Sequence, residues 1–274
     1  MKKSFILLMI SILLLGGLVG CNSASNNNDA GNQNQMEKLV VGATAKPHAE
    51  ILQVVKPILA ESGVDLDIRE FTDYVLLNPA VQDGQIDANF FQHIPYLDDY
   101  NKENNTDLQP LVKVHNEPMG VYSQKFNSID EIADGSGIGI PNDTTNSGRA
   151  LLVLQSAGLI TLKDGASYKA TTDDIVENDK NLKITMMDAA MLPRALEDLD
   201  LCVINSNYAL EANLNPAEDS LYMEAKDSPY ANVLVVKAEN INKQSVQILA
   251  NALQSQEVKD FLENTYPDSC IPSF

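Results

Sequence analysis

The chain has 274 residues, of which 44% are hydrophobic and 21% are charged, and its formal net charge is −19. This acidic balance argues against binding to nucleic acid and against an electrostatic attachment to anionic lipid, because both need clustered basic residues. The 239 residues from Met36 to the end are enough for one large domain or two medium ones.

The N-terminus predicts a secretion signal followed by a tether. Two lysines precede a short apolar run, which is the layout of a signal peptide and is too short for a stable membrane span. The segment LVGC, at 18–21, resembles a bacterial lipobox, and this resemblance implies that Cys21 is lipidated and begins the mature chain. The Asn-, Gln- and Ser-rich stretch that follows cannot form a core. We therefore expect a signal peptide over residues 1–20 and a flexible tether over 21–36.

Apolar runs of strand length then alternate with segments that have helical spacing. Strands are predicted over the ranges 38–44, 66–71, 137–142, 182–188, 201–205 and 232–237. Pro57 lies inside the first helical segment and is expected to kink or shorten that helix. A long amphipathic helix is predicted over 245–266. This alternation favours α/β units on largely parallel sheets.

Two segments, 116–132 and 226–237, have the pattern of crossings between two lobes. A chain that leaves one lobe and returns to it predicts a discontinuous first lobe, over 37–122 and 228–274, and an inserted second lobe over 123–227. Ligands of open α/β sheets bind beyond the carboxyl ends of the strands, and clefts between domains are favoured sites. The residues directly after the strands are therefore the candidates for a binding site.

Arginine and asparagine side chains follow several of these strands. Arg149, one of three arginines in the chain, lies about two turns into the helix predicted after the strand 137–142. The planar fork of arginine suits a two-point contact with a carboxylate, and a helix N-terminus favours an anion. The alternative is an arginine on the surface. Asn205, Asn207 and Asn232 could cap helices, or they could present amide oxygens to an ammonium group.

The stretch 85–100 concentrates aromatic side chains at a break in regular structure. Phe90 and Phe91 precede His93, and Pro95 blocks a regular helix or a central strand at this point. The aromatic residues either pack in a core or line a pocket. We predict that Phe90 faces the core and that Phe91 faces the pocket.

Long blocks of this sequence resemble the MetQ/NlpA lipoproteins, the methionine-binding components of bacterial ABC importers. The blocks are VGATAKPHAEIL, FTDYVLLNPAVQDGQIDANFFQHIPYLDDY, PNDTTNSGRALLVLQSAGLITLKDG, LPRALEDLDLCVINSNYA and DSPYANVLVV. The similarity extends from about residue 39 to the C-terminal helix. It implies a type II periplasmic-binding-protein fold, in which two α/β lobes with two crossings close on an amino acid.

The resemblance also implies roles for individual residues. The side-chain pocket of the family is matched by Tyr74, Phe91, His93 and Tyr96. Its carboxylate site is matched by Asn146 and Arg149, and the polar positions around the amino group are matched by Asn205, Asn207 and Asn232. Independently of the resemblance, a thioether is stabilised by contacts with aromatic rings, by roughly 0.3–1.5 kcal/mol.

Other classes of protein predict different features. A metal receptor needs clustered histidine and carboxylate ligands, whereas His48, His93 and His115 are scattered along the sequence. A hydrolase is not indicated, because the chain has neither a Gly-x-Ser-x-Gly elbow nor a recognisable cysteine nucleophile motif. An adhesin would not need the arginine and asparagine set. A receptor for another small amino acid, for a methionyl peptide or for a metal stays open as the alternative, as does a disulfide between Cys202 and Cys270.

We therefore expect a binding protein and not an enzyme, without metal or cofactor. It is expected to be a monomer on the extracytoplasmic face of the cell membrane, attached only through its lipid anchor. Its expected partners are L-methionine or a close analogue and an ABC permease.

Overall fold

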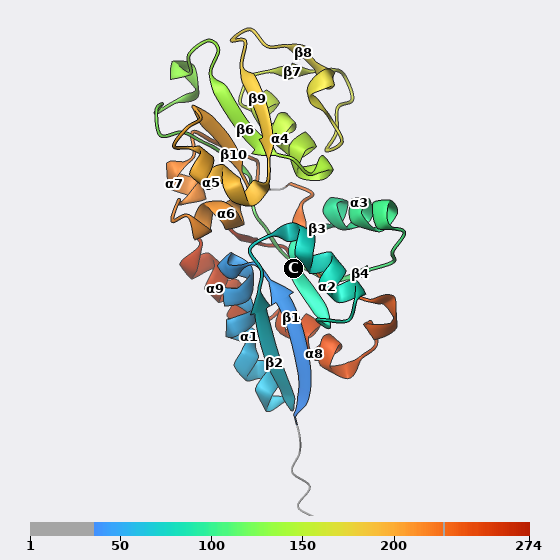
Figure 1. The fold of residues 1–274 in the computed structure, drawn as a ribbon. Coiled ribbons are helices and arrows are strands. Elements are labelled where there is room, and N and C mark those ends of the chain that lie inside the picture. The colour runs from blue at the N-terminus through green and yellow to red at the C-terminus, as the bar shows by residue number, and fades with distance from the viewer. Residues whose placement is uncertain (1–35, 227) are drawn as a thin grey trace, which may run out of the picture. The chain divides into compact units, whose positions relative to one another are not determined.

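The computed structural model describes residues 36–226 and 228–274. The predicted signal peptide, Cys21 and all but the last residue of the predicted tether lie outside the described residues. The described chain is an α/β protein with two mixed sheets and helices packed against both (Figure 1). A third, two-stranded sheet joins β7 (Thr161–Leu162) and β8 (Ile175–Glu177). Within the described residues, no helix combines the length and the apolar character that a membrane span requires.

The first lobe is built on a six-stranded sheet in the order β13-β4-β12-β3-β1-β2. Its strands are β1 (Glu37–Ala43), β2 (Val64–Glu70), β3 (Ala88–His93), β4 (Gln109–Asn116), β12 (Ala231–Val236) and β13 (Ile271–Pro272). β1 pairs in parallel with β2 and β3, whereas β12 is antiparallel to both β3 and β4. The prediction of largely parallel sheets is wrong here, because the strand that returns from the second lobe inserts between β3 and β4 in the opposite direction.

The second lobe is built on a five-stranded sheet in the order β11-β5-β10-β6-β9. Its strands are β5 (Gly120–Tyr122), β6 (Gly137–Pro141), β9 (Lys183–Met187), β10 (Leu201–Ile204) and β11 (Tyr222–Met223). β6 is parallel to β9 and β10, and β5 is antiparallel to β10 and β11. The predicted boundary after residue 122 assigned β5 to the first lobe, but its pairing with β10 assigns it to the second, because the chain crosses directly after β4.

Apolar side chains alternate along β12 and build a core on each face of the first sheet. Leu234 and Val236 pack with α1, α8 and α9, whereas Val233 and Val235 pack with α2 and α3. The helices of this lobe are α1 (Glu50–Glu61), α2 (Leu77–Gln82), α3 (Ile94–Asn104), α8 (Gln244–Ala252) and α9 (Gln256–Thr265). Full burial of one such side chain contributes about 1.5–3 kcal/mol, so the central strand is firmly held.

The helices differ from the sequence-based expectation at two points. α1 continues through Pro57 to Glu61 and is not shortened at the proline. The predicted long C-terminal helix is two helices, because the Ser255 side chain accepts a hydrogen bond from the Val258 amide and so caps a new helix.

The second lobe also has a core on each face of its sheet. α4 (Thr144–Ser156) packs on one face, and α5 (Leu192–Ala195) and α6 (Ser206–Glu211) pack on the other. The remaining α-helix of the described chain is α7 (Pro216–Asp219). Cys202 lies buried in β10 and Cys270 lies buried just before β13, and both are free thiols.

Candidate functional site

A pocket lined mostly by buried residues lies where strand ends and helix starts of both lobes meet. It is lined by Tyr74, Phe91, Gln92, His93, Tyr96, Glu117, Asn146, Arg149, Asn205, Ser206, Asn207 and Asn232. The nine residues predicted from the sequence for the ligand site are all brought together here. Three further residues, Gln92, Glu117 and Ser206, were not predicted.

Three aromatic rings form one wall of the pocket. The centroid of the Tyr74 ring lies 5.4 Å from that of Phe91 and 6.0 Å from that of Tyr96, and the Phe91 and Tyr96 centroids are 5.6 Å apart. Phe90, one residue before Phe91, is fully buried in the core between the first sheet and α1. The two neighbouring phenylalanines thus divide between core and pocket as the sequence analysis predicts.

His93 ends β3 and caps the helix that follows. Its Nδ1 accepts a hydrogen bond from the Tyr96 amide, and its Nε2 donates to Asn146 Oδ1, which lies in the second lobe, at 3.3 Å. Pro95 sits in the first turn of α3, where the proline lacks only an amide that the helix does not use. Burial, assisted by the positive charge of Arg149, lowers the pKa of His93 to about 3, so the imidazole is neutral.

Asn146 connects the polar groups on the second-lobe side of the pocket. Asp143 caps α4 by accepting from the Asn146 amide, and it also accepts from the Asn146 side chain. Asn146 Oδ1 accepts from His93 and, at 2.9 Å, from Asn205 Nδ2. The side chain predicted to bind a carboxylate is therefore already engaged with three protein partners.

Arg149 is buried and tied to Glu117, between β4 and β5, and to Glu224, directly after β11, so the alternative of a surface arginine is wrong. Its Nε donates to both carboxylate oxygens of Glu224, at 3.1 and 3.2 Å, and its Nη2 donates to Glu224 Oε2. Nη2 also donates to the backbone oxygen of Glu117 at 2.7 Å. The guanidinium lies over the ring of Tyr230, with its carbon 4.2 Å from the ring centroid.

This arrangement decides which part of Arg149 can meet a ligand. The edge formed by Nε and Nη2, which makes the two-point contact, is engaged by Glu224. Nη1 has no hydrogen-bond partner among residues 36–226 and 228–274. One residue earlier, Gly148 lets α4 pack closely against the backbone at Tyr168, because a Cβ on Gly148 would lie 2.2 Å from the backbone oxygen of Tyr168.

Two buried amide atoms in the pocket lack partners within the described chain. They are Asn205 Oδ1, an acceptor, and Asn207 Nδ2, a donor. The other amide atom of Asn207, Oδ1, accepts a hydrogen bond from the Tyr74 hydroxyl across the two lobes. Buried polar atoms are almost always hydrogen-bonded, so an unpaired acceptor and an unpaired donor in one pocket indicate a polar ligand.

The pairing of β12 with its neighbours positions Asn232. It lies opposite His93 of β3 on one side and opposite His115 of β4 on the other. Its Oδ1 accepts from His48 Nε2 at 3.2 Å. The third predicted asparagine is therefore a link between the pocket and a group of buried histidines.

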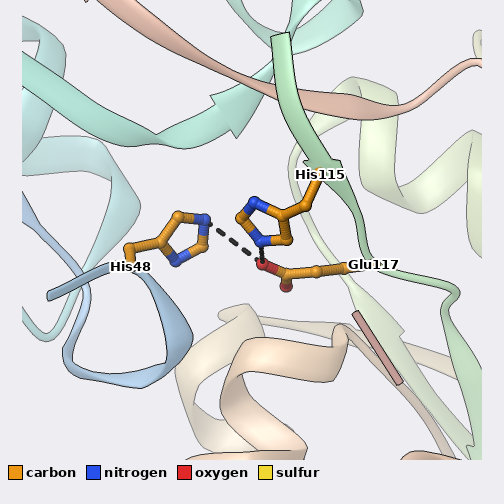
Figure 2. A group of neighbouring side chains, drawn as sticks. All are labelled: His48, His115 and Glu117. Atoms are coloured by element: carbon orange, nitrogen blue, oxygen red, sulfur yellow. Dashed lines mark hydrogen bonds and ion pairs between the residues drawn. The ribbon is translucent and has the colours of Figure 1, made fainter. Parts of the chain in front are cut away.

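Figure 2 shows this group, in which His48 and His115 converge on Glu117. Glu117 Oε1 lies 2.6 Å from His115 Nε2 and 3.2 Å from His48 Nε2, and the centroids of the two imidazole rings are 5.2 Å apart. The histidines are scattered along the sequence, but the fold brings these two together.

His48, His115 and Glu117 are also the residues of the described chain that could hold a metal ion, since one ligand atom of each lies within 4.8 Å of the others. The hydrogen bonds indicate another use. Both Nε2 atoms carry protons, which His115 donates to Glu117 Oε1 and His48 donates to Asn232 Oδ1, whereas a metal needs their lone pairs. Burial lowers the pKa of His48 to about 4, so this imidazole is neutral, and its Nδ1 accepts from the Thr44 hydroxyl at 2.8 Å.

The three unpredicted residues differ in how far the sequence could have revealed them. Glu117 follows His115 at an interval of two, inside the predicted crossing 116–132, and a charged residue in a crossing is a usable signal. Gln92 is engaged with Asn78 and gives no such signal. Ser206 lies between two asparagines that were predicted.

Two α/β lobes, two crossing segments and one buried pocket lined from both lobes define the class of two-lobed solute-binding proteins with the type II fold. Comparisons with known proteins agree with this class. Residues 39–274 match the family described as NlpA lipoprotein, and the chain belongs to that family.

Individual relatives cover most of the chain. The D-methionine-binding lipoprotein MetQ of Salmonella typhi is 42% identical over 234 residues, which make up 84% of this chain and 86% of that protein. A nutrient-binding protein of Burkholderia cenocepacia, solved bound to methionine, is 44% identical with a TM-score of 0.83 and covers 86% of this chain and 100% of its own. Lipoprotein Tp32 of Treponema pallidum is 38% identical with a TM-score of 0.83, and the match covers 87% of this chain and 100% of that chain.

Proposed function

We propose that this protein is a lipid-anchored, extracytoplasmic receptor that binds L-methionine or a close analogue and delivers it to an ABC permease. The observation that carries the proposal is one buried pocket with an aromatic wall and, opposite it, unpaired polar atoms of both kinds. The relatives support it, since one is named for D-methionine and another was solved with methionine bound. The task is binding and release, with no chemical step.

The aromatic wall suits the thioether of the ligand. Tyr74, Phe91 and Tyr96 offer ring faces and edges around one apolar space, and sulfur is stabilised by such contacts by roughly 0.3–1.5 kcal/mol. His93, neutral and hydrogen-bonded through both nitrogens, completes this wall without adding a charge. Unbranched apolar side chains of similar length should also enter, because apolar pockets discriminate by only about 1–3 kcal/mol per methylene.

The ligand carboxylate is assigned to Arg149, with a revised geometry. Because Glu224 engages Nε and Nη2, the carboxylate meets Nη1, and the unpaired Asn207 Nδ2 is a second donor. Asn146, expected as a direct carboxylate partner, acts instead by orienting His93 and Asn205.

The ligand amino group is assigned to Asn205, whose unpaired Oδ1 is an acceptor. An ammonium group has three donors and no acceptor, so acceptor oxygens are what it requires. Asn232 contributes by linking this region to His48, and Asn207 is better suited to the carboxylate than to the amino group.

The segments around the domain complete the proposal. Residues 1–20 are the signal peptide, Cys21 carries the lipid and 21–36 form the tether. The first lobe comprises 37–116 and 231–274, and the second comprises 120–223, so that the lobe boundary falls before β5. The mature protein acts as a monomer.

A thermal-shift screen of amino acids on protein stripped of endogenous ligand tests the function. Methionine should raise the melting temperature, with a stabilisation of about 2.7 kcal/mol at a hundred-fold excess over Kd. Native mass spectrometry of gently purified protein should detect a co-purifying ligand with the mass of methionine or of a close analogue. A clear response to a metal ion or a sugar, with none to methionine, would contradict the proposal.

A further inference from the structure

Glu117 lies in the segment that connects β4 of the first lobe to β5 of the second, and its carboxylate is held from both lobes. His48 and His115 of the first lobe meet Oε1, and the backbone amide of Asn207 in the second lobe donates to Oε2 at 3.1 Å. The side chain is only 6% exposed, and it lines the pocket. No candidate role for Glu117 came from the sequence.

The charge of this carboxylate has no fixed cation of its own. Burial raises the pKa of Glu117, but His48, His115 and Arg149 outweigh it, so the net shift is downward and the group is ionised. Within the described residues the basic side chains nearest to it are the two histidines, of which His48 is neutral, and the guanidinium of Arg149 is paired with Glu224. A buried negative charge without a paired cation is destabilising, which makes the pocket favourable for a positive group.

The hydrogen bonds leave one position of the carboxylate open. A carboxylate has about four lone-pair sites. Oε1 of Glu117 accepts from His115 and lies 3.2 Å from His48 Nε2, whose proton is donated to Asn232 Oδ1. Among the described residues Oε2 accepts only from the Asn207 amide, so it has a lone pair left for a further donor. Asn205 Oδ1 is a second unpaired acceptor in the same pocket.

We infer that Glu117 binds the ammonium group of the ligand through Oε2, together with Asn205 Oδ1, and that His48 and His115 are positioning residues for it. The inference rests on the proposed function, because it requires a ligand that carries an ammonium group. It adds a charged contact to a site for which the sequence suggested only amides. It also explains why two imidazoles are buried behind the pocket: His115 donates to Oε1, and His48, held by Asn232, packs beside this oxygen, so that together they fix the direction of Oε2.

The test compares two ligands that differ only at this group: L-methionine, and the hydroxy acid with a hydroxyl in place of the ammonium. Calorimetric titration of Glu117→Gln should show an affinity for methionine reduced by about ten-fold or more, as expected for loss of a charged hydrogen bond. The affinity for the hydroxy acid should change by less than about three-fold, because it places no cation at Glu117. Glu239→Gln, at an exposed position, is the matched control and should leave both affinities unchanged.

The positioning role is tested with His115→Phe, which keeps a ring but removes the donor to Oε1. The ratio of the methionine affinity to the hydroxy-acid affinity should fall, whereas a purely structural role would weaken both ligands by the same factor. If Glu117→Gln lowers the affinities for methionine and for the hydroxy acid by the same factor, or leaves the affinity for methionine unchanged, the ammonium assignment is overturned. Absence of methionine binding to the wild-type protein would contradict the proposed function instead.

Glu117→Gln must be shown to be folded by circular dichroism. If it is not, a crystal structure of the wild-type protein with L-methionine decides the question. The ligand nitrogen should lie about 3 Å from Glu117 Oε2. A nitrogen directed away from this carboxylate would overturn the inference.

Discussion

Replacement of Arg149 by lysine should weaken both the folded protein and the ligand complex. Lysine keeps the positive charge but loses the planar fork that contacts Glu224 through Nε and Nη2 and reaches the Glu117 backbone through Nη2. These contacts tie α4 to Glu117, between β4 and β5, and to Glu224, directly after β11. The substitution therefore removes more than a ligand contact.

The magnitude follows from the number and kind of bonds lost. A hydrogen bond to a charged group contributes about 1.5–3 kcal/mol, so the free energy of unfolding without ligand should fall by about that amount. For a domain of this size, the melting temperature should drop by about 3–12 °C. Loss of the Nη1 contact with the carboxylate should lower the affinity by about ten-fold or more, and equally for methionine and norleucine, which share that carboxylate.

Differential scanning calorimetry without ligand and calorimetric titration with both ligands measure these two effects separately. Arg194→Lys is the matched control, because Arg194 is exposed and should tolerate the change in both assays. An Arg149→Lys protein that melts and binds like the wild type would refute the assigned role of Arg149. A loss confined to one of the two ligands would refute the carboxylate assignment.

Three further predictions test other parts of the account. In calorimetric titrations, Phe91→Leu should lower the affinity for methionine more than the affinity for norleucine, because only methionine carries the sulfur. Equal losses of affinity would show that the sulfur makes no special contact with this ring. Leucine is used because Phe91 is almost fully buried and Phe→Ala would remove about 3–5 kcal/mol of stability. Burial lowers the pKa of His93 to about 3, so between pH 6.5 and 3 the unfolded chain binds a proton that the folded chain does not, and stability falls as pH falls. Urea unfolding followed by circular dichroism measures the free energy of unfolding at pH 7 and at pH 5. Its decrease from pH 7 to pH 5 should be about 2 kcal/mol larger in the wild type than in His93→Gln, and equal decreases would contradict a neutral, buried His93. Cys21→Ala should release the protein from membranes or leave its signal uncleaved, as cell fractionation can show, and a processed variant that stays membrane-bound would disprove the anchor.

The residues of the pocket could be predicted from the sequence because the resemblance covered long blocks, but their contacts could not. Asn232 is a clear instance. Its place between His93 and His115 depends on β12 inserting between β3 and β4, which is a pairing across more than a hundred residues of chain. Sequence periodicity reports which face of a strand is buried and says nothing about which strand is its neighbour.

Local sequence rules failed around Pro95, where a strand and a helix follow each other directly. Pro95 correctly indicated that regular structure breaks, but it marked the start of α3, and the strand directly before it was not recognised. Glu117 shows a different difficulty. Its place in a predicted crossing was a signal, but among 38 acidic residues that place does not reveal burial against two histidines, because His48 arrives from the segment before α1.

The central claim is that the pocket formed by both lobes is a methionine site. Calorimetric titration of the ligand-free wild-type protein with L-methionine tests it most directly. We predict saturable binding of one methionine per chain, with a negative heat-capacity change because apolar surface of the thioether is buried among the rings. No binding heat at several temperatures, together with an unchanged melting temperature at saturating methionine, would contradict the claim.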